Sequence, residues 1–278
     1  MHSLLRVPNG PVDLSDVDPA GTPGFDGRKK DGKEATLDVA DELADQQERL
    51  FAEGRTGGAR SVLLVLQGMD GSGKGGTVKH VVGQVDPQGV RIASFGKPTK
   101  EELAHDFLWR IKAQLPPAGR IGVFDRSHYE DVLVVRVREL VPRRTWLRRY
   151  DTINRCEEGL VAGGCRVVKV FVHISPDEQR DRMLARLDDP TKHWKYNPAD
   201  LDDRALWPDF MEAYEAVLER CNTEAAPWYL VPADRKWYRN WAITHLLLEH
   251  LQEMALQWPK ADYDVEAEKQ RILSARTV

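Results

Sequence analysis

The stretch Gly68-Met69-Asp70-Gly71-Ser72-Gly73-Lys74 matches the pattern G-x-x-x-x-G-K. Glycines let a loop curl so that successive backbone N–H groups point at phosphate oxygens, and a lysine adds a mobile positive charge. An apolar run precedes the stretch and a helical pattern follows it, as expected for a phosphate-binding loop and not for an incidental glycine-rich turn. The residues predicted to contact phosphate are Gly71, Ser72, Gly73, Lys74, Gly75, Gly76 and Thr77.

The loop departs from the common motif at one position. Gly75 follows the lysine, where Ser or Thr usually holds magnesium. Asp70, inside the loop, is the predicted replacement because Mg²⁺, or Mn²⁺ in its place, takes hard oxygen ligands. Thr77 is a weaker candidate, and Asp70 could instead only form a turn.

A second acidic position ends an apolar run over residues 121–124. Asp125 there is predicted to reach the metal from a neighbouring strand, as in the Walker B arrangement, although an aspartate can also merely cap a helix. Arg126 follows and could fork across phosphate oxygens. Glu130 is predicted to assist the metal or orient the acceptor, with a helix first-turn acid as the equal alternative.

Further cations lie at other predicted strand ends. Lys97 follows the second predicted strand. Arg182 and Arg186 share one helix face and open a segment, about 182–200, predicted to close over the phosphates as a lid. Surface salt bridging to nearby aspartates is the alternative. The arginine cluster over residues 136–149 reads as a solvated helix face or as an attractor for a polyanion.

These residues need a sheet to bring them together. Apolar runs of strand length alternate with helical patterns, which predicts an α/β fold with a five-stranded, mainly parallel sheet. Strands are expected over 61–67, 90–95, 120–124, 167–174 and 228–231, and helices over 37–51, 73–85, 101–115, 129–140, 143–160, 205–221 and 237–258. The chain divides into an extended or mobile arm (1–36), a phosphotransferase domain (37–258) and a tail (259–278).

Composition narrows the function classes. A net charge of −4, from 40 Lys and Arg against 44 Asp and Glu, disfavours general nucleic-acid binding. No apolar run approaches the ~20 residues of a membrane helix, so no membrane association is expected. Cys156, Cys165 and Cys221 include no close pair, which favours a reducing, cytoplasmic location and offers no zinc site.

Taken together, five segments resemble the polyphosphate kinase 2 family: GMDGSGKGGTVKH, SFGKPT followed by EELAHDFLWR, FDRSHYEDVL, RLDDPTKHWK and APWYLVPADRKWYRNW. The resemblance implies a thymidylate-kinase-like three-layer P-loop fold with a helical lid. It also implies a Mg²⁺-dependent, reversible transfer of the terminal phosphoryl group of inorganic polyphosphate to ADP, AMP or both. The forms SFGKPT and PADRKWYRNW are nearest to the subgroup that uses AMP and ADP.

Carried over by position, the resemblance implies catalytic roles for six residues: Asp70, Lys74, Asp125, Arg126, Arg182 and Arg186. The two aspartates would handle the metal and the transferred phosphate, and Lys97 would contact phosphate. A homo-oligomer, dimer or tetramer, is also implied. Two other readings of the chain stay open: an ATP-dependent nucleoside monophosphate kinase and a non-catalytic nucleotide-binding module. Formation of ATP from polyphosphate and ADP would distinguish a polyphosphate-dependent kinase from both of these alternatives.

Overall fold

The structure, a computed structural model, describes residues 1–275. Its centre is a sheet of five strands: β1 Ser61–Gln67, β2 Val90–Ser94, β3 Ile121–Asp125, β4 Cys165–His173 and β5 Trp228–Pro232. The strands lie in the order β2-β3-β1-β4-β5, and every neighbouring pair is parallel. The predicted α/β class and five-stranded parallel sheet are confirmed.

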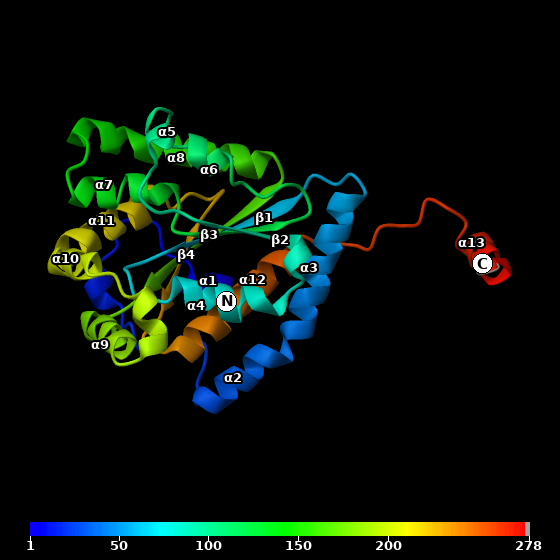
Figure 1. Cartoon of the computed structure of the whole chain (residues 1–278), viewed down its shortest axis with the longest axis horizontal. Helices are drawn as coiled ribbons and strands as arrows, with labels where there is room; N and C mark the ends of the chain where they lie inside the picture. Colours follow the sequence, from blue (N-terminus) through cyan, green and yellow to red (C-terminus); the bar gives the residue numbers. More distant parts are fainter. Residues whose placement is uncertain (276–278) are drawn as a thin grey trace.

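Helices cover both faces of the sheet, because β1 is apolar on both. Val62, Leu64 and Leu66 belong to one core, with side chains of α3 and α12, whereas Leu63 and Val65 belong to the other, with side chains of α8 and α11. Figure 1 shows α8 on one side of the sheet and α3 and α12 on the other. The bounds of these helices are α3 Ala40–Arg55, α8 Arg143–Ala162, α11 Trp207–Arg220 and α12 Lys236–Glu253.

The carboxyl ends of the parallel strands place the predicted site residues at one edge of the sheet. The phosphate loop joins β1 to α4 (Lys74–His80), which continues into a short 3-10 turn, η2 (Val82–Gln84). Asp125 ends β3 in register with Leu66 of β1 and Ser94 of β2. A ligand crevice at this edge is the usual consequence of such a sheet.

The N-terminal segment is more structured than a bare extended arm. It contains α1 (His2–Leu5), η1 (Leu14–Asp16) and α2 (Lys29–Asp38), and the Val7 N–H donates to the Trp228 carbonyl oxygen at 2.9 Å. The boundary expected between residues 36 and 37 falls inside α2. The single helix expected over 37–51 is wrong: α2 ends at Asp38 and α3 begins at Ala40, with Val39 between them, and each helix packs against α12 separately.

Two other predicted helices are broken. In place of one helix over 101–115 there are α5 (Lys100–Leu103) and α6 (Trp109–Lys112). The Asp106 carboxylate accepts from the Leu108 N–H at 2.9 Å, which starts a new turn between them. An aspartate that bonds to the backbone two residues on competes in this way with helix continuation.

The predicted helix over 129–140 is likewise replaced by η4 (His128–Asp131) and α7 (Val134–Val137). Glu139 has a positive φ of 50°, which ends the helical path. The closing helix α12 stops before the predicted Trp258.

The segment expected to form the lid consists of the end of α9 (Pro176–Leu187), then η5 (Pro190–Lys195) and α10 (Ala199–Ala205). The C-terminal tail contains α13 (Val265–Ser274), which stands away from the body of the molecule in Figure 1. Residues 276–278 of that tail lie outside the described residues. Within residues 1–275, no helix combines the length and apolar character needed to span a bilayer.

Candidate active site

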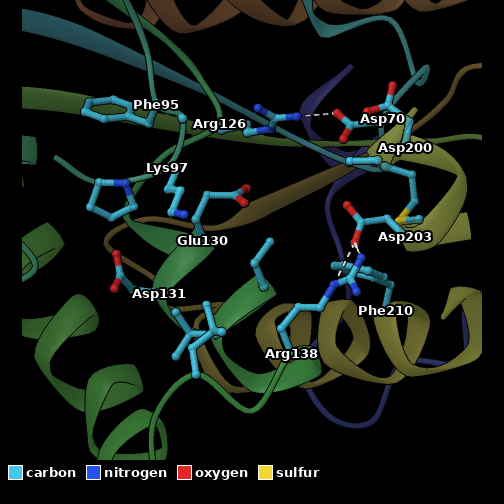
Figure 2. A pocket seen from close by; sticks show the side chains of 18 of the residues that line it. Asp70, Phe95, Lys97, Arg126, Glu130, Asp131, Arg138, Asp200, Asp203 and Phe210 are labelled. Carbon is cyan, nitrogen blue, oxygen red and sulfur yellow. Dashed lines mark hydrogen bonds and ion pairs between the residues drawn. The ribbon is translucent and has the colours of Figure 1, made fainter. Parts of the chain in front are cut away.

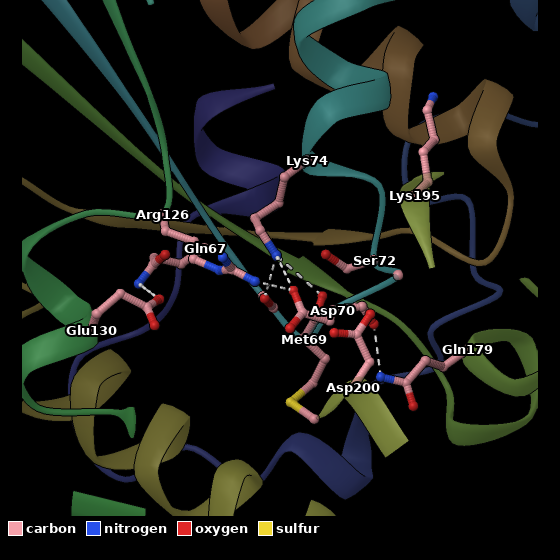
Figure 3. A network of polar contacts seen from close by, with 12 residues as sticks. Gln67, Met69, Asp70, Ser72, Lys74, Arg126, Glu130, Gln179, Lys195 and Asp200 are labelled. Carbon is pink, nitrogen blue, oxygen red and sulfur yellow. Dashed lines mark hydrogen bonds and ion pairs between the residues drawn. The ribbon is translucent and has the colours of Figure 1, made fainter. Parts of the chain in front are cut away.

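The phosphate loop is closed by its own lysine. Lys74 Nζ folds back and donates to the carbonyl oxygens of Gly68 (2.7 Å) and Met69 (3.2 Å), as Figure 3 shows. Gly73 has a φ of 107°, and a Cβ there would lie 1.7 Å from Arg239 Nη1. Glycine is therefore required at this position for both conformation and space.

Asp70 faces two cations inside this loop. Its Oδ1 forms an ion pair with Arg126 Nη2 (Figures 2 and 3) and lies 3.8 Å from Lys74 Nζ (Figure 3). Burial alone would raise the pKa of Asp70, but Lys74 and Arg126 outweigh it and lower that pKa. Asp70 is therefore an ionised oxygen donor at the centre of the site.

Arg126 reaches Asp70 through an uncommon backbone conformation. Its φ is 63°, in the left-handed region that non-glycine residues rarely adopt. Such a residue costs about 1–3 kcal/mol, and strain of this kind concentrates at functional sites. The Arg126 N–H still donates to the Leu66 carbonyl oxygen at 3.1 Å. The hydrogen bonding between β3 and β1 therefore extends one residue beyond the end of β3, to Arg126.

Asp125 lies opposite the first turn of α4. A Cβ built at Gly75 would be 3.9 Å from Asp125 Oδ2, so the carboxylate faces the position where other P-loops carry a metal-binding hydroxyl. The phosphate loop thus contains one carboxylate, that of Asp70, and a second, that of Asp125, faces Gly75. Two hard oxygen donors so placed fit Mg²⁺ chemistry.

The hydroxyls of Ser72 and Thr77, both predicted to contact phosphate, differ in whether they are free to bind a ligand. The Ser72 hydroxyl is fully buried and, among the described residues, has no hydrogen-bond partner. A buried hydroxyl left in this way is suited to a ligand oxygen. The Thr77 hydroxyl instead donates to the Gly73 carbonyl oxygen at 3.4 Å, within its own helix.

A cavity of about 770 Å³, here called the Phe95 pocket, borders the loop at Gly68, Met69 and Asp70 (Figure 2). Its walls combine apolar and charged side chains, among them Phe95, Lys97, Leu103, Arg126, Glu130, Val134, Arg138, Asp203 and Phe210. Both Lys97 and Glu130 thus lie on this side of the loop.

Glu130 is held on the pocket wall by a neighbouring strand. Its Oε1 accepts from Gln67 Nε2 at 3.2 Å (Figure 3). Burial raises the pKa of Glu130, although Arg126 and Lys74 oppose that rise. Glu130 therefore contrasts with Asp70, whose pKa the same cations lower.

A second cavity, of about 830 Å³, borders the loop at Gly71, Gly73 and Gly76; we call it the basic groove. Within residues 1–275 no Asp or Glu lines it. Ten basic side chains do: Lys29, Lys33, Lys79, His80, Arg182, Arg186, Lys192, Lys195, Lys236 and Arg239. The phosphate loop therefore separates a cation-lined groove from a pocket of mixed character, and contacts both.

The two predicted lid arginines have different surroundings. Arg182 is 7% exposed and donates to the carbonyl oxygens of Gly71 (2.9 Å) and Ser72 (2.8 Å), so it holds the phosphate loop from behind. Arg186 lies 3.6 Å from Asp200 and stays within the lid segment. Only Arg186 has the position expected of a cation on a moving cover.

Sequence reasoning missed Arg239. It is 2% exposed and donates to the Ser72 carbonyl oxygen (3.4 Å) and to Asn240 Oδ1 (2.7 Å). No carboxylate pairs with it among the described residues. Burial and then the nearby Arg182 lower the pKa of Arg239 to about 10. A buried cation without a counter-ion is costly, so an anion beside the loop would stabilise it.

The signal for Arg239 was in the sequence. Lys236 and Arg239 are three residues apart at the start of a helix, and therefore share one face. The same holds for Lys29 and Lys33 of α2, four residues apart in a segment that was expected to be an arm.

A buried polar network fixes the segment that carries Arg126 and Glu130. Glu157 of α8 accepts from Tyr129 Oη (2.8 Å) and Lys169 Nζ (2.6 Å) and contacts His128 Nε2 (3.0 Å). Lys169 also donates to the Cys221 carbonyl oxygen at 2.6 Å. These groups are buried, and the network joins η4 to α8 and β4 directly behind the site.

Comparison with known proteins agrees with this geometry. The family model for polyphosphate kinase 2 (PPK2) matches residues 26–259. The chain is 48% identical to the AMP/ADP-polyphosphate phosphotransferase of Meiothermus ruber over 262 residues, 94% of this chain and 97% of that protein. It is 44% identical to the ADP-polyphosphate phosphotransferase of Rhodopseudomonas palustris, over 78% of each. The crystal structure of polyphosphate kinase 2 from Arthrobacter aurescens TC1 matches with a TM-score of 0.94 at 51% identity, covering 98% of this chain and 95% of that one.

Proposed function

Because this chain belongs to the polyphosphate kinase 2 family, we propose that it transfers the terminal phosphoryl group of inorganic polyphosphate to ADP or AMP, reversibly and with a divalent metal. The observation that carries the proposal is the position of the phosphate loop between the basic groove and the Phe95 pocket. A transfer between two substrates needs sites that meet at the reacting group, because holding both in place removes much of the entropic barrier.

Polyphosphate fits the basic groove. The polymer offers only anionic oxygens, and a groove lined by cations and by no carboxylate within residues 1–275 attracts it along its length. Its terminal phosphate would meet the Ser72 hydroxyl, Lys74 and the buried Arg239 at the loop. Gly71, the residue after Asp70, lines this end of the groove.

A nucleotide fits the Phe95 pocket. Its volume lies within the roughly 300–1,000 Å³ typical of small-molecule sites. Phe95, Phe210 and aliphatic neighbours can cover a base, while Lys97 and Arg126 can bind the phosphate that accepts the new group. The relatives named for AMP and ADP support both as acceptors.

The chain's own groups perform the transfer mainly by positioning and charge stabilisation. A nucleotide phosphate oxygen is already ionised, so it attacks the terminal phosphorus without a general base, and the shortened polyphosphate leaves. Loop N–H groups, Lys74 and Arg126 meet the charge on the transferring oxygens. We further propose that the 182–200 segment closes over the site, with Arg186 as its cation.

Asp70 and Asp125 would hold the metal, with Mg²⁺ favoured and Mn²⁺ as an alternative. A bound divalent ion supplies charge neutralisation between the two polyanions. Both carboxylates are positioned by the protein itself. Asp70 is held by Lys74 and Arg126, and Asp125 is held by the register of β3. A reducing compartment fits the three unpaired cysteines.

The test crosses donors with acceptors. Purified protein with Mg²⁺ receives long or short polyphosphate, or ATP, as donor, and AMP, ADP, GMP or GDP as acceptor, and products are separated by ion-exchange chromatography. We expect ATP from polyphosphate and ADP, and ADP from polyphosphate and AMP. Transfer only from ATP to a monophosphate would contradict the proposal and identify a nucleoside monophosphate kinase. Nucleotide binding without any transfer would identify a binding module.

A further inference from the structure

A histidine-rich cluster lies away from both cavities, where α1 meets the end of α12. His2 of α1 packs on His250 of α12 with ring centroids 3.9 Å apart, and both rings lie near that of Tyr229. His2 Nδ1 is 2.8 Å from Glu253 Oε1. None of these residues lines the basic groove or the Phe95 pocket.

His250 is the unexplained member of this cluster. It is 3% exposed, and neither of its ring nitrogens has a hydrogen-bond partner among the described residues. A buried imidazole normally finds at least one partner, and an unsatisfied polar group costs about 1–3 kcal/mol. Simple aromatic packing would be served as well by Phe, which carries no such cost.

The donor atoms converge as metal ligands do. One atom from each of His2, His250 and Glu253 lies within 4.8 Å of the other two. In a tetrahedral zinc site, bond lengths of about 2.0–2.1 Å separate ligand atoms by roughly 3.4 Å. Atoms 4.8 Å apart would need to approach by about 1.4 Å, whereas His2 Nδ1 and Glu253 Oε1, at 2.8 Å, would need to separate slightly. Small χ rotations can supply both changes, since His2 and Glu253 are not fully buried.

A second carboxylate lies beside His2. If His2 binds through Nδ1, its Nε2 lies 4.0 Å from Glu249 Oε2, which already accepts from the His2 backbone N–H at 2.8 Å, and a small shift would bring the two side chains into hydrogen-bond range. A carboxylate behind a ligating histidine fixes its tautomer and strengthens binding.

We propose that His2, His250 and Glu253 form a binding site for a transition metal of the zinc class, separate from the catalytic divalent ion. Two imidazoles and one carboxylate suit Zn²⁺ rather than Mg²⁺, which prefers oxygen ligands. His250 and Glu253 come from one turn of α12, and His2 comes from the N-terminal segment. A bound ion would fasten that segment to the closing helix.

The test measures zinc binding directly. Protein is stripped with EDTA and titrated with ZnCl₂ by calorimetry in a buffer free of polyphosphate, nucleotides and Mg²⁺, since phosphates bind metals. We expect one site per chain in the unaltered protein, and a rise in Tm on adding zinc. His250→Phe keeps the ring packing, and Glu253→Gln keeps the shape; each should weaken this site at least tenfold. His245→Phe, on the same helix, is the matched control and should bind normally.

Two results would overturn the proposal. One is the absence of a zinc site in the unaltered protein. The other is zinc binding of unchanged affinity and stoichiometry in folded His250→Phe, which would locate the ion elsewhere, for example at Asp70 and Asp125. Circular dichroism and the Tm without zinc confirm that each variant folds. Since the readout is binding and not turnover, failure here leaves the proposed phosphotransfer unaffected.

Discussion

Lys74 and Asp125, in the roles proposed for them, act by charge and position and not by covalent chemistry. One is an ammonium group held by two carbonyl oxygens, and the other is a carboxylate held by strand register. Neither has to change its covalent state during the proposed transfer. Their contribution depends on being in place before the substrates arrive.

Removing either charge should therefore reduce turnover and leave the fold intact. We expect Lys74→Met and Asp125→Asn each to lower kcat by about 100- to 1,000-fold, the usual effect of losing one pre-positioned charge-stabilising group. Initial rates with polyphosphate and ADP measure this, and circular dichroism checks folding. Rates near those of the unaltered protein would contradict the roles proposed for both residues.

Arg239 makes a different prediction, because its charge is buried without a carboxylate among the described residues. Arg239→Met should raise KM for polyphosphate at least tenfold, while Tm stays equal or rises by roughly 2–4 °C for each 1 kcal/mol gained. The exposed Arg235, one turn earlier and outside the groove lining, provides the control Arg235→Met. A lower Tm with unchanged KM would show that Arg239 is a structural residue.

At the scale of elements, α2 extends the basic groove beyond the loop. Lys29 and Lys33 line the groove from this helix, whereas Lys30, on the same helix, does not. A polymer long enough to reach α2 gains contacts that a short one lacks. We therefore expect any chain-length preference to depend on this helix and not on the residues of the phosphate loop.

Lys29→Ala/Lys33→Ala should therefore separate long donors from short ones. At about 0.7 kcal/mol per exposed ion pair, the double substitution should raise KM roughly tenfold for long polyphosphate and leave KM for short chains unchanged. Raised ionic strength should remove the difference. Lys30→Ala is the control. Equal effects on long and short donors would place the polymer elsewhere.

The Glu157–Lys169 pair is the second feature at this scale. Burial would raise the pKa of Glu157, but Lys169 and His128 lower it below its ordinary value of 4.5. Because its folded pKa is depressed, its stabilising contribution is complete above 4.5 and is lost as the pH falls through the folded value. Glu157→Gln should cost about 3–5 kcal/mol in urea unfolding at neutral pH, since Lys169 keeps a buried charge.

A double substitution checks the origin of that loss. Glu157→Met/Lys169→Met removes both charges and should recover most of the stability lost in Glu157→Gln. The gap between the unaltered protein and Glu157→Gln should also narrow below pH 4.5. A double variant less stable than Glu157→Gln, or a gap independent of pH, would contradict this account of the pair.

Strands were predictable from the sequence and helix ends were not. A run such as Val62–Leu66 is apolar at every position, which is typical of a strand buried on both faces. The helix breaks at Val39, Asp106 and Glu139 depend on tertiary packing or on a single side-chain hydrogen bond. The spacing of apolar residues in the sequence carries no information about either. Loop residues such as Asp70 and Lys74 were identified because their motif is contiguous. Arg239 was missed because it reaches the loop from the far end of the chain.

At the scale of the whole molecule, we predict a homo-oligomer. Helix α13 stands apart from the body and exposes Ile272 and Leu273, at 73% and 78%. Light scattering coupled to gel filtration should give a mass of two or four times 31.6 kDa. Removing residues 259–278 should reduce that mass if α13 joins the subunits. A single-chain mass for the full protein would contradict the oligomer.

The basic groove has a consequence for the kinds of molecules that could block it. Nine lysines and arginines gather there with no acid from residues 1–275 on the wall. Three of them, Arg182, Arg186 and Lys192, pair with acids outside the lining, and the other six leave a charge imbalance that a polyanion would neutralise. An uncharged mimic of the same shape would leave that imbalance in place and bind poorly. A sulfated polysaccharide, unrelated in structure but dense in negative charge, would be accepted readily. We therefore expect selectivity for phosphate to arise at the phosphate loop, where Gly71, Gly73 and Arg239 line the groove.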